Sequence, residues 1–206
     1  MSAGGTITLR MAGLIAGMCV ATTVLAGCGG GGSAAGDVVS GGTFTLAMSS
    51  DPGNLDPQSS VATNNYQMAF LAYDSLLSVD GSGAIRSELA TSWHVDGKNV
   101  TLTMHKGITC SDGSAFTAQT AADNLNYVAN PKNNSPFAGV FLPVGAKATA
   151  EGNALTVALP SSAPLILDGL AGIPMVCGKG IANRKVLAAK TDGTGAYALS
   201  QATPGD

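Results

Sequence analysis

Two strand–turn–strand patterns that enclose one capped helix place the strongest limit on the fold of this 206-residue chain. In the first pattern, apolar and polar residues alternate on both sides of Asp96-Gly97, a dipeptide that favours a tight hairpin turn. The second pattern, over 146–159, repeats this alternation around Glu151-Gly152-Asn153. Between them, Thr117 is a suitable N-cap for a helix that Asn130-Pro131 would end. Strands and helices mix without a regular strand–helix–strand repeat, which predicts a layered α/β (mixed α+β) fold.

The segment before the first hairpin predicts a strand, a turn and a helix. Apolar residues alternate with smaller or polar ones over 43–48, which is typical of a strand. The prolines and glycine of 51–57 would end that strand, since they cannot continue a ladder. From a possible N-cap at Thr63, apolar residues recur at steps of three and four, which predicts an amphipathic helix. Its apolar face would comprise Tyr66, Ala69, Phe70, Tyr73, Leu76 and Leu77.

The first 40 residues differ in composition from the rest. Arg10 precedes a mainly apolar run of about 16 residues, which is short for a bilayer span and typical of a secretory signal. The run ends in Leu25-Ala26-Gly27-Cys28, which resembles the lipobox of bacterial lipoproteins and implies that Cys28 carries lipid. We therefore predict a signal peptide over 1–27 and a Gly/Ser-rich tether over 28–40. An ordinary leader or membrane helix with an incidental cysteine is the alternative.

The four cysteines predict one disulfide. Cys19 would leave with the leader and Cys28 would carry lipid, so the exported part keeps Cys110 and Cys177. An even number of thiols outside the cytoplasm favours pairing, and we predict a Cys110–Cys177 bridge. Two buried free cysteines are the alternative.

Several blocks in residues 41–206 occur in an order and spacing that match one family. They are Gly41 to Leu46 with Asn54-Leu55-Asp56-Pro57, Tyr73-Asp74-Ser75-Leu76-Leu77, Leu89 to Trp93, Asp96-Gly97 and Val100 to Gly107 with Asp112 to Ala118, and Gly193 to Tyr197. Together they resemble the bacterial extracellular solute-binding proteins of family 5, which deliver peptides, nickel or related solutes to ATP-driven importers. Arg86-Ser87-Glu88 and Ala196 depart from it where proline is usual.

The resemblance implies a periplasmic-binding-protein-like fold of type II. Residues 41–206 would form the N-terminal portion of the solute-binding domain, with the C-terminal lobe absent, so that this part alone would bind weakly. The implied function is that of a substrate-binding lipoprotein of an ABC importer that captures peptides. Its partners would be the permease subunits and, through the lipid anchor, the extracytoplasmic face of the cell membrane.

Solute contacts are expected where loops leave a rigid scaffold. The loop after the first predicted strand and the end of the predicted helix meet this condition. They supply five candidate ligand-binding residues, which are Met48, Ser49, Ser50, Asn54 and Tyr73.

Charge and motif content argue against other classes. The net charge of −3 and the lack of a basic run exclude a nucleic-acid partner. His94 and His105 occupy polar positions of alternating strands without metal-ligand spacing, so we expect no metal. Neither Ser49-Ser50-Asp51 nor Gly81-Ser82-Gly83 has the flanks of a nucleophile elbow, so we expect no catalytic residue and no cofactor. A surface-anchored enzyme whose catalytic part lies elsewhere and an inactive gene fragment stay open as alternatives.

Overall fold

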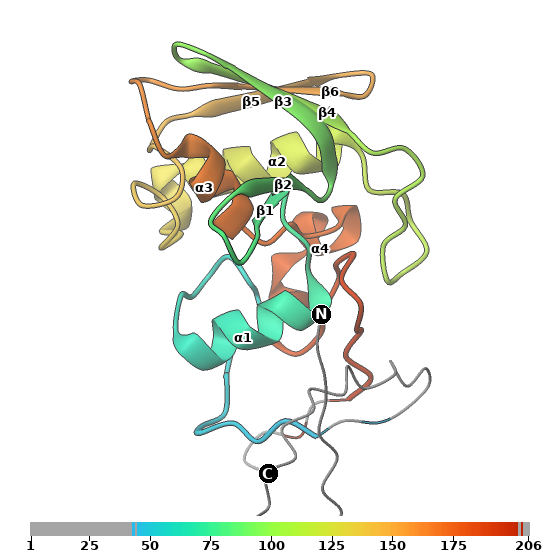
Figure 1. Cartoon of the computed structure of the whole chain (residues 1–206). Coiled ribbons are helices and arrows are strands. Elements are labelled where there is room, and N and C mark those ends of the chain that lie inside the picture. The colour runs from blue at the N-terminus through green and yellow to red at the C-terminus, as the bar shows by residue number, and fades with distance from the viewer. Residues whose placement is uncertain (1–42, 44, 202, 204–206) are drawn as a thin grey trace, which may run out of the picture. The chain divides into compact units, whose positions relative to one another are not determined.

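The computed structural model describes residues 43, 45–201 and 203, and one compact unit begins at Leu46 (Figure 1). Cys28, the predicted signal peptide over 1–27 and the tether over 28–40 lie outside the described residues. Within the described unit, the chain forms two sheets and several short helices.

Both predicted hairpins are confirmed and together form one antiparallel sheet. The strand order is β3-β4-β6-β5, so the last strands of the two hairpins pair with each other at the centre. The turns lie where Gly97 and Gly152 adopt positive φ angles of 58° and 56°, which glycine accepts without steric cost. The strands are β3 (Ala90–Asp96), β4 (Asn99–Met104), β5 (Lys147–Glu151) and β6 (Ala154–Ala158).

The capped helix is also confirmed, and it covers one face of this sheet (Figure 1). Helix α2 (Ala118–Ala129) begins where the side chain of Thr117 accepts a hydrogen bond of 3.2 Å from the Thr120 amide. Its buried face packs on β5 and β6. The inward residues of β4, which are Val100, Leu102 and Met104, alternate with exposed ones and join the same core. The apolar residues that alternate along the strand and those that recur along the helix therefore pack into one hydrophobic layer.

The helix predicted from Thr63 onward is shorter than its apolar pattern. Helix α1 (Thr63–Ala72) has Ala62 at its N-cap, so Thr63 is its first residue and not its cap. Tyr73 leaves the helix in an extended conformation, and Phe70 is 61% exposed. The predicted face over 66–77 is therefore wrong in both its length and its membership.

The backbone after α1 pairs with a distant segment, which explains why the helix stops. The carbonyls of Ser75 and Leu76 accept hydrogen bonds of 3.3 and 2.9 Å from the amides of Leu89 and Ala90. Strand β1 (Leu77–Val79) then pairs antiparallel with β2 (Ile85–Ser87). Backbone groups engaged in these bonds cannot also continue a helix.

The described residues of the strand predicted over 43–48 do not form a strand. Residues 45–48 belong to no strand, and Leu46 is 52% exposed. An alternating pattern becomes a strand only where a neighbour supplies the other half of the ladder, and no strand among the described residues pairs with this segment.

Short helices fill the space below the sheet. Helix α3 (Ile166–Gly172) packs so closely that a Cβ on Gly169 would lie 2.0 Å from the Phe141 carbonyl oxygen, so this position requires glycine. None of the helices in the described part of the chain has the length and hydrophobicity to cross a membrane. The remaining elements are η1 (Pro131–Asn133), α4 (Gly178–Ala182) and η2 (Arg184–Ala188).

Candidate functional site

Among the cavities in the described part of the chain, one, here called the larger cavity, lies between the loop that begins at Leu46, helix α1, the end of η2 and the last described residues. Its volume is about 880 Å³, within the range of small-molecule sites. Most of its wall is apolar, and Ser50, Asp51 and Thr203 add polar groups. The main apolar contributors are Leu46, Met48, Leu55, Met68 and Leu199.

Helix α1 fixes the loop that forms one wall of this cavity. The side-chain amide of Asn64 donates to the carbonyl and the hydroxyl of Ser50 at 2.8 and 2.7 Å. The next residue on α1, Asn65, donates to the Asn54 carbonyl. Within the loop, the Asp51 carboxylate accepts from the Gly53 amide at 2.7 Å, and Gly53 has a φ of +68°. Local polar contacts thus give the loop a defined shape.

A buried ion pair joins this loop to η2. Arg184 Nε donates to Asp56 Oδ2 at 3.0 Å, and a second guanidinium nitrogen donates to Oδ1. The guanidinium also lies 3.7 Å above the ring centre of Tyr127 on α2. Close by, the Leu55 amide donates to the Ala188 carbonyl at 3.4 Å, and both of these residues line the cavity. The ion pair therefore holds two walls of the cavity at a fixed separation.

Next to this ion pair, two buried amide side chains connect the loop to α2. Gln58 Nε2 donates to Asn124 Oδ1 at 2.9 Å and to the Pro174 carbonyl at 2.7 Å. Asn124 exchanges two hydrogen bonds with the backbone of Val176, at 2.8 and 2.9 Å. Gln58 and Asn124 are fully buried. Such a network fixes one arrangement of the loop, because a shifted loop would bury unpaired polar groups.

A second cavity, of about 360 Å³, has an acidic and aromatic lining. Tyr66 and Phe70 form part of it, together with the carboxylates of Asp74, Glu88 and Asp168. Burial, and to a smaller extent the nearby charge of Asp74, raise the pKa of Glu88 to about 7, although a hydrogen bond with the Ser75 backbone acts in the opposite direction. In the described part of the chain, no group of three or more His, Cys, Asp or Glu side chains has an arrangement suited to a metal ion.

The structure separates the five residues predicted to contact solute. Met48 and Ser50 line the larger cavity, whereas Tyr73 lines the acidic one. Ser49 Oγ lies 3.5 Å from Asn64 Oδ1. The Asn54 side chain accepts a hydrogen bond of 3.0 Å from the Asp56 amide and so shapes the turn. Two of the five therefore share the larger cavity.

Tyr73 has structural contacts that the sequence did not indicate. Its ring is buried, and its hydroxyl accepts a hydrogen bond of 3.2 Å from the Asp192 amide. Burial raises the pKa of Tyr73 to about 12, so the phenol is neutral at physiological pH.

Sequence reasoning missed Arg184 and noted Glu88 only for its departure from the family. Arg184 stands in a segment without a clear pattern, 128 residues from its partner. Asp56 belongs to the Asn54-Leu55-Asp56-Pro57 block of the family pattern, and this block does not indicate an ion pair.

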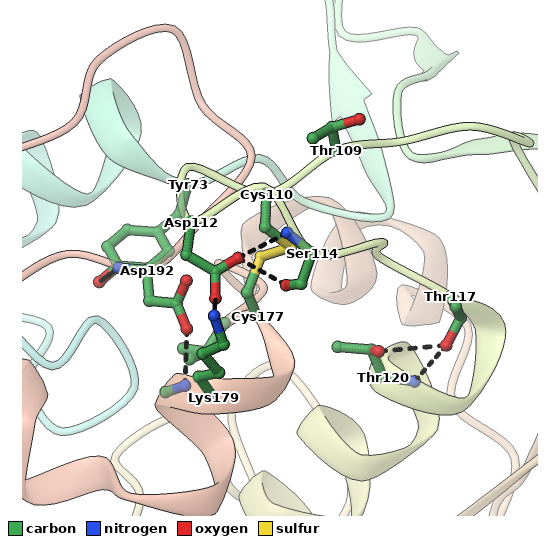
Figure 2. Close-up of a disulfide and its surroundings, with 12 residues drawn as sticks. Tyr73, Thr109, Cys110, Asp112, Ser114, Thr117, Thr120, Cys177, Lys179 and Asp192 are labelled. Carbon is green, nitrogen blue, oxygen red and sulfur yellow. Dashed lines mark hydrogen bonds and ion pairs between the residues drawn. A yellow bond between two sulfur atoms is a disulfide. The ribbon is translucent and has the colours of Figure 1, made fainter.

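The structure contains the predicted disulfide between Cys110 and Cys177, 67 residues apart in sequence (Figure 2). An ion pair of 2.8 Å between Lys179 and Asp112 lies beside it. Lys179 and Ser114 hold the pKa of Asp112 well below its ordinary value by hydrogen bonding to the carboxylate. The disulfide and the ion pair thus connect the same loop to the start of α4.

Comparison with known proteins gives relatives of one kind. The probable deoxycholate-binding periplasmic protein YgiS of Escherichia coli K12 is 33% identical over 98 residues, which are 47% of this chain and 18% of YgiS. A substrate-binding protein of Microbacterium hydrocarbonoxydans, solved with 4-hydroxybenzoate hydrazide, is 31% identical with a TM-score of 0.67. The match covers 76% of this chain and 34% of that chain.

A third relative shows the same fold at lower identity. The murein tripeptide binding protein MppA of Escherichia coli is 20% identical, with a TM-score of 0.67 over 77% of this chain and 36% of MppA. The chain thus spans about a third of the length of these solved proteins. The predicted mixed α/β, periplasmic-binding-protein-like fold class is confirmed.

The family comparison covers more than half of the chain. Residues 84–206 match the bacterial extracellular solute-binding proteins, family 5 Middle. This range includes the hairpin sheet, α2 and the disulfide. The chain therefore belongs to family 5 of the bacterial extracellular solute-binding proteins.

Proposed function

We propose that this chain is the N-terminal part of the solute-capturing lipoprotein of an ABC importer. The family match over residues 84–206 is the observation that carries the proposal. The coverage of about a third of each solved relative supports the assignment to one part of a larger binding protein. The permease subunits of the importer are the proposed partners, and lipid on Cys28 is the proposed anchor.

The proposed solute is a small organic molecule with an apolar body and few polar groups. Side chains such as Met48, Leu55 and Met68 give the larger cavity a mainly apolar wall, while Ser50 and Asp51 offer polar partners. Apolar walls with a small number of placed polar groups are typical of small-molecule sites. Two relatives above 30% identity support the same class of solute. YgiS is named as a probable deoxycholate-binding protein, and the Microbacterium hydrocarbonoxydans protein was solved with 4-hydroxybenzoate hydrazide.

A peptide is the second candidate solute, as the sequence resemblance implies. One observation favours it: Leu46, Ala47 and Met48 line the cavity and belong to no strand. A chain segment outside any sheet can pair with the backbone of an added peptide, which gives affinity through main-chain hydrogen bonds.

Nuclear magnetic resonance titration of the purified chain tests both candidates, because it detects the weak binding expected of one lobe. Deoxycholate, 4-hydroxybenzoate hydrazide and trialanine would each be added to millimolar concentration. We expect amide shifts around 46–55, Met68, Ala188 and Leu199 with the first two probes. Shifts confined to trialanine would favour the peptide. If none of the three probes shifts a cluster of amides around the cavity, the result would contradict solute capture at this cavity and favour an inactive fragment.

A further inference from the structure

Residues 191–199, here called the return segment, lie directly against the end of α1. The amides of Gly195 and Tyr197 donate to the carbonyls of Ala72 and Leu71 at 3.1 and 2.9 Å. A Cβ on Gly193 would lie 2.2 Å from the Ala72 carbonyl oxygen, and one on Gly195 would lie 2.5 Å from the Ala72 carbonyl carbon. Only glycine permits this approach, so the contact requires an accurately placed backbone.

The disulfide holds the opposite side of the return segment. The Cys177 amide donates to the Asp192 carbonyl at 2.8 Å, and the amide of Ser111, next to Cys110, donates to the Gly193 carbonyl at 2.8 Å. Two donors, one from each side of the disulfide, therefore bind two consecutive carbonyls. Figure 2 shows Asp192 close to the bridge that joins these donors.

The side chain of Asp192 adds a buried contact to the same arrangement. One of its carboxylate oxygens accepts a hydrogen bond of 2.6 Å from the Gly180 amide on α4, whereas the other has no partner. Burial raises the pKa of this carboxyl above its ordinary value. A half-paired buried carboxyl adds little binding free energy, so backbone hydrogen bonds, to the end of α1 on one side and beside the disulfide on the other, retain the segment.

The far end of the return segment reaches the larger cavity. The Leu199 amide donates to Thr191 Oγ1 at 2.9 Å, which ties the end of the segment to its beginning, and Leu199 lines the cavity wall. A continuous set of contacts thus leads from the disulfide through Asp192 and Gly193 to that wall.

We infer that the Cys110–Cys177 disulfide is a lock on the return segment that closes after export. In the reducing cytoplasm both cysteines are thiols and their neighbouring amides are not held together. Outside, a disulfide donor takes two electrons and two protons from the two thiols and leaves as two thiols, while the Cys110–Cys177 bond forms. The return segment and the cavity wall then order in the compartment where solute is captured.

Amide hydrogen exchange on the purified full chain, oxidised or as the Cys110→Ser/Cys177→Ser variant, tests the lock. We expect exchange at the amides of Asp192, Gly195 and Tyr197 to accelerate in the variant by at least about tenfold more than exchange in α2 and β4, which reports the loss of global stability. Unchanged exchange in the return segment would overturn the inference. An equal acceleration everywhere would also overturn it, because the disulfide would then act only on global stability.

A matched control is Lys179→Met, which removes the neighbouring ion pair and keeps both cysteines. Exchange in its return segment should stay within about twofold of the parent chain, and an effect as large as that of the cysteine variant would refute the assignment to the disulfide. If the cysteine variant does not fold, the oxidised chain at low denaturant decides. There, the three amides should exchange only through global unfolding, and local opening with the bridge intact would disprove the lock.

The effect of the lock on solute rests on the proposed function. In the oxidised chain, deoxycholate should shift the Leu199 amide, and the cysteine variant should lose that shift. If deoxycholate shifts no cavity amide in the oxidised chain, the proposed solute class fails, whereas the exchange result still decides the lock.

Discussion

The guanidinium of Arg184 binds both carboxylate oxygens of Asp56, with side-chain exposures of only 13% and 7%. The two residues stand 128 positions apart, and the pair closes the loop before α1 onto η2. Tyr127 covers the guanidinium, so water has limited access to the pair. Removal of one partner would leave a buried charge without compensation.

Arg184→Met should therefore lower the free energy of unfolding by about 3 kcal/mol, measured by urea denaturation. The additional change Asp56→Asn should restore part of this loss, because it removes the unpaired charge. Arg86→Met breaks an exposed ion pair with Asp80 and is the matched control, with a much smaller effect expected. A loss no larger than that of the control would show that the buried pair is not a main contributor.

Glu88 should make the folded state less stable as pH rises from about 4.5 to about 7. Its pKa is about 7 in the folded chain and 4.5 in the reference state. Over this pH range Glu88 loses its proton in the unfolded state but keeps it in the folded state, so deprotonation favours unfolding. The resulting loss of stability is complete above pH 7. Urea denaturation of the parent chain and Glu88→Gln at about pH 5 and about pH 8 measures it.

The Glu88→Gln variant should gain stability relative to the parent chain at the higher pH and differ little at the lower pH. The acidic cavity around Asp74 and Asp168 remains in both proteins, so their difference isolates Glu88. Parallel pH profiles for the two proteins would contradict a raised pKa at this residue.

Thr117→Ala should cost about 1 kcal/mol of stability, because the Thr120 amide at the start of α2 loses its acceptor. Thr63→Ala is the control, because Thr63 begins α1, a helix without a side-chain cap hydrogen bond. Removal of the Thr63 hydroxyl should therefore not destabilise the chain. Thermal unfolding of both variants makes the comparison, and equal destabilisation would argue against a capping role for Thr117.

Mass spectrometry of the membrane fraction should find the mature chain starting at lipid-modified Cys28. The apolar run that ends in Leu25-Ala26-Gly27-Cys28 is the reason for this expectation. Cys28→Ala should release the chain from the membrane. A variant that stays bound, or an unmodified chain that begins elsewhere, would disprove lipid anchoring.

Local sequence determined the elements whose interactions lie within about a dozen residues. The Asp96-Gly97 and Glu151-Gly152 turns set the hairpins because glycine accepts positive φ there. Thr117 and Asn130-Pro131 set the two ends of α2, since a cap and a proline act on the nearest turn. The cysteine count also indicated the Cys110–Cys177 bridge that the structure contains.

Tertiary structure decided the features that need a distant partner. The alternation over 43–48 predicted a strand, yet no described strand pairs with residues 45–48, and a ladder cannot form from one side. Phe70 fits a helical apolar period but is exposed, because packing and not periodicity determines which face is covered. The Asp56–Arg184 pair, the pKa of Glu88 and the position of Tyr73 against Asp192 likewise depend on residues brought together only by folding, because burial and charge proximity are properties of space and not of sequence spacing.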